Sequence, residues 1–327
     1  MHPESLMSAA RVLRDAPTVA LACHVNPDAD ALGSMLALAH HVVARGATVT
    51  CAFPSPPDDL PRWAELLPGR DLLVHPDAFP TSPGVMVTCD CASFDRLGAL
   101  GHAASRAAEL IWVDHHRSND GRGTVRIVDP AASSTCELVV ELIDAIGGEL
   151  TRDSAICLYA GLVTDTGRFQ YEAATPRTLQ VAARLRGFDF DHAGLSQALY
   201  EDNARAYLTI TGTALRRLAD VPEADLVWTY LTQADLHEAG VHPAETDDLI
   251  DVIRTSRDAD VAAIVKQQRD GRFKVSIRSR GGHDLSAVAA SFGGGGHRLA
   301  AGYTSAHGPA GTIERLVAAL RGEPVAP

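Results

Sequence analysis

Residues 18–46 read TVALACHVNPDADALGSMLALAHHVVARG, and this stretch decides the fold class. Its first eight residues, Thr18–Val25, are apolar and rich in β-branched side chains, which is typical of a buried strand. Residues 31–45 then place apolar side chains at helical spacing, and Gly46 is a typical helix stop. A strand that is apolar on both faces and runs into a helix predicts a parallel sheet covered on both sides.

The same alternation continues along the chain. Further strand-like runs lie at 47–53, 85–90 and 110–114, and helical patterns lie at 134–146 and 155–163. After about residue 225 a second set begins, with predicted strands at 226–231, 261–267 and 273–277 and predicted helices at 247–255, 286–292 and 312–320. The Asp270-Gly271 pair between two of these strands is a hairpin signal. The length and this break in pattern predict two domains.

Composition and charge limit the class of protein. Of the 327 residues, 46% are hydrophobic, which excludes a disordered or fibrous chain. The formal net charge of -12 argues against a protein that coats duplex DNA or an anionic membrane by charge alone. The excess of acidic residues lies in residues 1–215, which carry a net charge of -10. In contrast, segment 266–280 carries six basic residues and one acidic residue.

Cysteine usage and hydropathy indicate the compartment. The six cysteines form no C-x-x-C pair, so we expect free thiols in a reducing cytoplasm rather than a disulfide framework. No run reaches the ~18 apolar residues of a membrane span. The N-terminal segment lacks the apolar core of a signal peptide. We therefore expect a cytoplasmic protein with no membrane partner.

The turn after the first predicted strand carries three potential ligands for a hard metal ion, His24, Asp28 and Asp30. Two aspartates separated by one residue can point to different sides of such a turn and could serve two metals. The alternative is a Pro-Asp turn with an aspartate helix cap, and Asp30 could be that cap.

Polar residues also end three other apolar elements. Asp90 closes the strand-like run 85–90, where a buried carboxylate is costly unless something positive binds it. Asp114, His115 and His116 end the run 110–114, and Asp165 follows the helical pattern 155–163. In contrast, we expect Cys89 and Cys91 to be small buried hydrophobes and the pair His40-His41 to lie on a helix surface.

Because the carboxyl ends of parallel strands meet at one edge of a sheet, these side chains are expected along one rim. So many carboxylates would repel one another without cations. A two-metal site with one bridging carboxylate removes this repulsion. It also suits phosphoryl chemistry, because it activates a water and stabilises both the attacking and the leaving oxygen.

Five features together resemble the DHH phosphoesterase superfamily and its DHHA1 substrate-binding domain. They are HVNPDADALGS at 24–34, Asp90, VDHHRSN at 113–119, GLVTDTGRFQY at 161–171 and RSRGGHDLSAVAASFGGGGHRLAAG at 278–302. Their order and spacing match nearly the whole chain and are most similar to the NrnA-type oligoribonucleases, which also act as 3'-phosphoadenosine-5'-phosphate (PAP) phosphatases. The resemblance implies an enzyme with two divalent metal ions, most commonly Mn²⁺.

The resemblance assigns roles residue by residue. The implied ligands are His24, Asp28 and Asp90 for one metal, and Asp30, Asp90, His115 and Asp165 for the other, with Asp90 bridging. Asp90, Asp114 and His116 are the implied catalytic residues. Asp114 would orient the histidines. His116 would contact the scissile phosphate or help to protonate the leaving oxygen.

Substrate contacts are implied mainly in the second domain. Without the family, the glycine tract would be read as a flexible loop. With it, Gly294, Gly295 and Gly296 would let backbone amides approach a nucleotide phosphate, as an anion-binding nest. Arg278, Arg280 and His297 would grip the substrate. Arg96 and Ser134 are weaker phosphate-contact candidates.

We therefore predict an α/β protein with an N-terminal doubly wound, mainly parallel sheet and a smaller C-terminal α/β domain with a mixed sheet. The active-site cleft would lie between them. The expected boundaries are 1–190 for the catalytic DHH domain, 191–217 for a helical linker and 218–327 for the DHHA1 domain. A homodimer is expected.

The predicted activity is hydrolysis of very short RNA, such as the dinucleotide pApA, with PAP phosphatase and cyclic di-AMP phosphodiesterase activities. No long duplex is expected as a partner. Two other enzymes of the same superfamily are the alternatives. A DHH-family pyrophosphatase would carry a lysine-rich motif near its C-terminus, and this chain has no lysine after Lys274. A single-strand exonuclease is normally longer than this chain. A non-catalytic nucleotide-binding regulator would be expected to lack a metal ligand, and none is missing.

Overall fold

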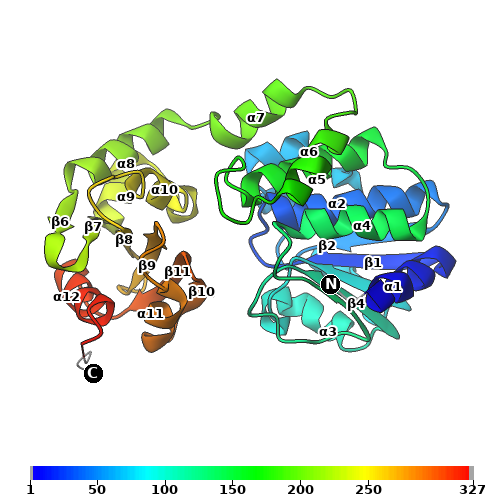
Figure 1. Cartoon of the computed structure of the whole chain (residues 1–327), viewed down its shortest axis with the longest axis horizontal. Helices are drawn as coiled ribbons and strands as arrows, with labels where there is room; N and C mark the ends of the chain where they lie inside the picture. Colours follow the sequence, from blue (N-terminus) through cyan, green and yellow to red (C-terminus); the bar gives the residue numbers. More distant parts are fainter. Residues whose placement is uncertain (1–2, 324–327) are drawn as a thin grey trace. The chain divides into compact units, whose positions relative to one another are not determined.

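The computed structural model describes residues 3–323 and contains two compact units (Figure 1). The first unit is Met1–Asp202 and the second is Asn203–Pro327. The boundary falls inside segment 191–217, between α7 (His192–Tyr200) and α8 (Arg205–Arg216). Each unit has its own sheet. No helix among the described residues combines the length and the apolar character needed to cross a membrane.

A five-stranded parallel sheet forms the centre of the first unit, in the order β2-β1-β3-β4-β5. The strands are β1 (Thr18–Cys23), β2 (Thr48–Ala52), β3 (Val85–Cys89), β4 (Glu109–Asp114) and β5 (Val125–Val128). Leu21 and Ala22 of β1 are both fully buried although they belong to different cores. Burial on both faces explains the continuous apolar runs of the sequence, and the predicted parallel sheet is confirmed.

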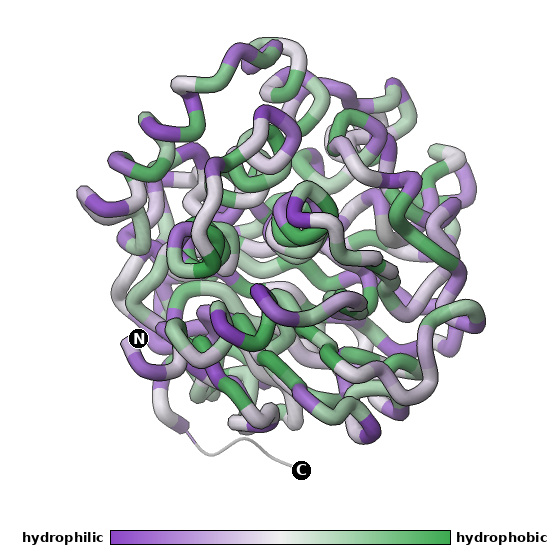
Figure 2. Tube along the Cα trace, turned by 90° about the vertical axis from the view of Figure 1, so that its right-hand side faces the viewer, coloured by the Kyte–Doolittle hydropathy of each residue, from purple (hydrophilic) through white to green (hydrophobic). Residues whose placement is uncertain are grey.

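Helices cover both faces of this sheet. On one side are α1 (Pro3–Asp15), α2 (Ala29–Ala44), α4 (Thr135–Ile146), α5 (Arg152–Asp165) and α6 (Pro176–Leu185); on the other are η5 (Phe94–Leu100) and α3 (Gly101–Ala104). Segment 57–78 adds four short 3-10 turns, η1 (Pro57–Asp59), η2 (Arg62–Leu66), η3 (Arg70–Leu72) and η4 (Pro76–Ala78). Figure 2 shows hydrophobic stretches through the interior and hydrophilic stretches in the outer turns. The doubly wound arrangement is confirmed.

Helices α2 and α5 pack closely because glycines lie at their contact. A methyl group added to Gly33 would overlap the backbone carbonyl of Cys157, and one added to Gly161 would lie 2.8 Å from the Asp30 Cα. Asp30 is in the first turn of α2, and Asp165 is the last residue of α5. The two glycines therefore set the separation of two helix ends that carry acidic residues.

The second unit has a six-stranded mixed sheet of order β10-β11-β9-β8-β7-β6, as predicted. Among the described strands of this sheet, β7 and β8 pair in parallel and the other neighbours pair antiparallel. The strands are β6 (Ala219–Val221), β7 (Leu226–Leu231), β8 (Val261–Gln267), β9 (Phe273–Ser279), β10 (Gly295–His297) and β11 (Ala300–Ser305). One face is covered by α8, α9 (Gln233–Ala239) and α10 (Leu249–Ile253), and the other by α11 (Leu285–Ser291) and α12 (Pro309–Leu320). Two further 3-10 turns are η6 (Pro222–Ala224) and η7 (Pro243–Thr246).

Two local expectations differ from the structure. Gly295–His297 form the edge strand β10 rather than a loop, and a methyl group on Gly296 would lie 2.6 Å from the Ala301 Cα of the paired strand β11. The tract therefore owes its glycines partly to close strand pairing. The expectation of a surface position is wrong for His41, which is 3% exposed.

Gly33→Ala tests the close contact between α2 and α5. The added methyl group would force the helices apart, so we expect the free energy of unfolding to fall by about 1–3 kcal/mol. Urea denaturation of the variant and the wild type measures this difference. Gly84→Ala is the matched control, because a methyl group there meets nothing within 4 Å. Equal stability of Gly33→Ala and wild type would contradict the packing argument.

Candidate metal centre

The turn between β1 and α2 positions three potential ligands. His24 follows β1 and is 4% exposed. Asp28 is the N-cap of α2, because its Oδ1 accepts a hydrogen bond of 2.9 Å from the Ala31 N–H. Asp30, in the first helical turn, is 1% exposed. The helix cap is therefore Asp28, and the alternative of Asp30 as that cap is not adopted.

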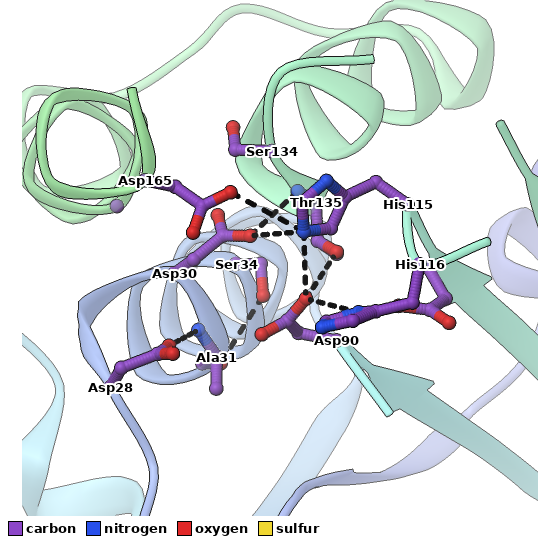
Figure 3. A network of polar contacts seen from close by, with 12 residues as sticks. Asp28, Asp30, Ala31, Ser34, Asp90, His115, His116, Ser134, Thr135 and Asp165 are labelled. Carbon is purple, nitrogen blue, oxygen red and sulfur yellow. Dashed lines mark hydrogen bonds and ion pairs between the residues drawn. The ribbon is translucent and has the colours of Figure 1, made fainter. Parts of the chain in front are cut away.

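Asp90 follows β3 with a backbone φ of +58°. A non-glycine residue in the left-handed region is strained, typically by about 1–3 kcal/mol, and such strain clusters at functional sites. Its N–H donates to the Val113 carbonyl at 2.9 Å, which continues the pairing of β3 with β4. The carboxylate is buried and points toward His115 and His116 (Figure 3).

Asp114 ends β4 and holds the second of the two histidines. Its Oδ1 lies 2.8 Å from the Nδ1 of His116, and its Oδ2 accepts a hydrogen bond of 2.6 Å from the Asn119 amide. The Asp114 carboxylate is fully buried. With both of its oxygens engaged in this way, Asp114 lies behind His116 instead of among the groups of ligand atoms.

Among the described residues, ligand atoms that lie within 4.8 Å of one another form three groups. The groups are His24, Asp28 and Asp90; Asp30, His115 and Asp165; and Asp90, His115 and His116. All six residues expected to be metal ligands therefore lie together. They come from the ends of β1, β3 and β4 and from two helix ends.

Asp90 faces two of these groups with different oxygens. Its Oδ2 lies 3.4 Å from the His24 Nε2, and its Oδ1 lies 3.6 Å from the His115 Nε2. His115 Nε2 is also 3.3 Å from the Asp165 Oδ2 and 3.9 Å from the Asp30 Oδ2. The arrangement suits one carboxylate shared between two cation positions.

The electrostatics of the centre also favour cations. Burial, together with the charge of Asp90, raises the pKa of both Asp30 and Asp165 well above the usual range. Burial opposes ionisation of Asp90 too, but hydrogen bonding to His24 and the charge of His115 lower its pKa. Positive charge placed among these carboxylates would favour their ionised forms.

The donor set consists of carboxylate oxygens and imidazole nitrogens, which suits Mn²⁺ and similar divalent ions. The nearby thiols do not join it. Burial raises the pKa of Cys23 and Cys89, and raises that of Cys91 to about 12, so all three stay protonated. All six cysteines are buried and free.

Two expected substrate contacts lie in the first unit. Arg96 is beside the centre, with its Nη2 2.7 Å from the His24 Nδ1. Ser134 is the fully buried N-cap of α4, and its Oγ accepts a hydrogen bond of 3.2 Å from the Glu137 N–H. The hydroxyl of Ser134 thus has a structural use, which weakens its candidacy as a phosphate contact.

The other expected substrate contacts belong to the second unit. Arg278 is on β9 with its Nε 3.5 Å from the Asp251 Oδ1, and Arg280 donates from Nη1 to the Ser256 carbonyl at 2.7 Å. Gly294 precedes β10, while Gly295, Gly296 and His297 form it. His297 is exposed.

Two residues at the centre had no role in the sequence prediction. Asn119 supports Asp114, and Thr135 donates from Oγ1 to the Asp90 Oδ1 at 2.8 Å. Asn119 lay within the quoted motif VDHHRSN. The only sequence signal for Thr135 was its position directly after a serine that could cap a helix.

Two known domains match the chain. The DHH family N-terminal domain matches residues 18–162, and the DHHA1 domain matches residues 226–323. The first match contains five of the six expected metal ligands, and Asp165 lies three residues beyond it. The second contains the glycine tract and the basic segment 266–280.

Known proteins resemble most of the chain. A protein of Thermus thermophilus described as the bifunctional oligoribonuclease and PAP phosphatase NrnA is 32% identical over 87% of this chain and 83% of its own length. The cyclic-di-AMP phosphodiesterase GdpP of Geobacillus thermodenitrificans is 27% identical over 59% of this chain and 29% of its own. An exopolyphosphatase-related protein of Bacteroides fragilis has the same fold, with a TM-score of 0.90, 21% identity and coverage of 98% and 96% of the two chains.

The contact between His116 and Asp114 makes the stability of the metal-free protein depend on pH. Although burial opposes it, hydrogen bonding to Asp114 raises the pKa of His116 to about 9, against about 6.5 in an unfolded chain. The protonated histidine therefore stabilises the fold below pH ~6.5, and this stabilisation is lost as the pH rises toward 9. At about 1.4 kcal/mol per pH unit, the loss is on the order of 3 kcal/mol.

Chemical denaturation of EDTA-treated protein between pH 6.5 and 9 measures this loss. His116→Asn is expected to flatten the decline, because the variant has no imidazole at this position to titrate. Asp114→Asn should flatten it as well, since the amide no longer raises the pKa of His116. A decline of equal steepness in wild type and His116→Asn would refute the assignment.

Proposed function

The chain belongs to the DHH phosphoesterase family, in the branch that carries a DHHA1 domain, and we propose that it hydrolyses very short oligoribonucleotides with two divalent metal ions. The substrates would be pApA and similar short RNA, cleaved to mononucleotides, and PAP, from which the 3'-phosphate is removed. The observation that carries this proposal is the convergence of six ligand residues that share Asp90 and His115 between groups.

The metal ions would be held by His24, Asp28 and Asp90 on one side and by Asp30, Asp90, His115 and Asp165 on the other. Mn²⁺ is the proposed ion, because the set combines carboxylates with imidazoles. Two bound cations supply charge that stabilises the attacking and leaving oxygens of an in-line displacement at phosphorus. The bridging role of Asp90 is supported by its two oxygens facing different histidines.

His116 is the proposed proton donor to the leaving oxygen. Its Nδ1 lies 2.8 Å from the Asp114 Oδ1, and the proton would be donated from the Nε2. In the metal-free protein, hydrogen bonding to Asp114 raises the pKa of His116 to about 9 although burial opposes it, and this favours the protonated ring that a proton donor needs. Asp114, which Asn119 holds in turn, fixes the orientation of the ring, and this is the usual role of carboxylates behind functional histidines.

Charge distribution supports a restriction to short substrates. Residues 1–215 carry a net charge of -10, whereas segment 266–280 has six basic residues and one acidic residue. A long strand would meet repulsion from the acidic first unit, while a dinucleotide needs only the metal ions and a few arginines. Arg278, Arg280, Arg96 and His297, with the glycine tract, are the proposed contacts.

Cyclic di-AMP is a second candidate substrate, because the similarity to GdpP spans 59% of the chain. The buried free thiols support a reducing compartment, so we assign the protein to the cytoplasm. A homodimer is part of the same proposal.

A substrate panel with Mn²⁺ tests the function. We expect turnover of pApA, of RNA of two to five nucleotides and of PAP, with little turnover of pyrophosphate or of RNA of ten nucleotides. Cyclic di-AMP is the sixth substrate of the panel. EDTA should abolish each activity.

Asp90→Asn should lower kcat/KM by at least about 10³-fold, since the shared carboxylate is lost, whereas Asp59→Asn, at an exposed site, should not. Full activity of Asp90→Asn would refute the two-metal assignment.

Arg278→Ala tests substrate recognition by the second unit. Loss of a charged contact to a phosphate is expected to raise KM for pApA about 10-fold or more, with kcat changed less. Arg257→Ala is the control, because that side chain is 91% exposed and, within residues 3–323, its ion pair is with its neighbour Asp258. If Arg278→Ala lowered kcat and left KM unchanged, Arg278 would belong to the chemical step instead.

A further inference from the structure

The first turn of α4 contacts two of the carboxylates of the metal centre. The backbone N–H groups of Thr135 and Cys136 donate to the two oxygens of Asp30, at 2.7 and 2.9 Å. The Thr135 hydroxyl donates to the Asp90 Oδ1 at 2.8 Å. In Figure 3, dashed lines mark the contacts of Thr135 with both carboxylates. Thr135 therefore connects Asp30 of α2 with Asp90, which follows β3.

We infer that Thr135 is a positioning residue that fixes Asp30 and Asp90 relative to each other and so sets the affinity of the centre for its metal ions. The geometry of the inference is independent of any substrate, whereas its consequence for turnover rests on the function proposed above. Thr135 would act through the two carboxylates and not through contact with a metal ion or a phosphate.

The amide contacts fix the orientation of Asp30. The first N–H groups of a helix have no partner within the helix, and the helix dipole favours negative charge at this end. Asp30 satisfies two of them at once, one with each oxygen. Rotation of the carboxylate would break both hydrogen bonds in a site that is 1% exposed. The lone pairs that remain on Asp30 are therefore held in fixed directions.

The hydroxyl contact does the same for Asp90. An ionised carboxylate can only accept, so Thr135 is the donor. This hydrogen bond uses one lone pair of Oδ1, the oxygen that faces His115, while Oδ2 faces His24. Without it, rotation about the last side-chain bond of Asp90 would be less restricted. Both groups of ligands that share Asp90 would then be affected.

A second network holds the beginning of α4 in place. Glu137, which is fully buried, accepts hydrogen bonds from the hydroxyls of Ser133 at 2.6 Å and Thr178 at 2.9 Å. It also pairs with the Nε of Arg177 at 2.9 Å. Ser133 precedes the helix, and Thr178 and Arg177 belong to α6. Because these contacts tie the helix start to α6, Thr135 has a rigid support.

The decisive substitution is Thr135→Val, which keeps the shape of the side chain and removes only its hydroxyl donor. The measurement is Mn²⁺ binding without substrate, by calorimetry and by the electron paramagnetic resonance signal of the bound ions. We expect 10–100-fold weaker binding of at least one ion, the range typical for residues that support metal ligands. Thr135→Ser keeps the hydroxyl and is expected to bind within about 3-fold of wild type.

Thr229→Val is the matched control. Thr229 is also fully buried, and its hydroxyl donates to a backbone carbonyl, that of Ala214, in the second unit. Its replacement should lower stability without changing Mn²⁺ affinity. Should Thr135→Val fail to fold, Thr135→Ala provides the same comparison, with circular dichroism as the test of folding.

The outcomes separate this inference from the proposed function. Unchanged Mn²⁺ affinity of folded Thr135→Val, or equal weakening by Thr135→Ser and Thr135→Val, would overturn the inference even if the wild type hydrolyses pApA. Weaker binding by Thr135→Val alone supports it even if the wild type turns over no substrate in the panel. A wild type that binds no Mn²⁺ would overturn both.

Discussion

The crowding of carboxylates at one edge of the parallel sheet is the constraint on which the rest of the site depends. Two like charges 4 Å apart repel by about 4 kcal/mol at an effective dielectric constant of 20. Four of these acids have hydrogen-bond donors from the protein. Asp28 accepts from one helix N–H and Asp30 from two more, Asp90 accepts from a hydroxyl, and Asp114 contacts an amide and an imidazole. Bound cations would add positive charge beyond these donors and would favour the ionised forms of Asp30 and Asp165, whose pKa burial raises.

Sequence reasoning located this edge because strand-end geometry is a local rule. The apolar strands ending near His24, Asp90 and Asp114 were each recognisable on their own, and parallel pairing brings their ends together whatever the rest of the chain does. The same rule placed the helices on both faces. The four-residue strand β5 was missed because so short an edge strand has little periodicity.

Other features depend on contacts that no local pattern encodes. Thr135 lies 105 residues from Asp30 in the sequence, and a threonine in the first turn of a helix is common. His41 is buried because the chain near Gly148 covers it, which its own helix cannot indicate. The glycine tract was predicted to let backbone amides approach a phosphate, whereas its pairing as the extended strand β10, where glycine permits close approach to β11, was not predicted.

The protein donors also determine what the carboxylates can offer to a cation. A carboxylate has about four lone-pair positions. On Asp30, the lone pairs that accept hydrogen bonds from α4 are already used. On Asp90, the lone pair that accepts a hydrogen bond from Thr135 is already used. The positions left are fewer and are fixed in direction, so the centre would restrict the coordination geometry of a bound ion. On the positioning role inferred for Thr135, a helix start 105 residues from Asp30 would limit the geometry of the site together with the proposed ligands.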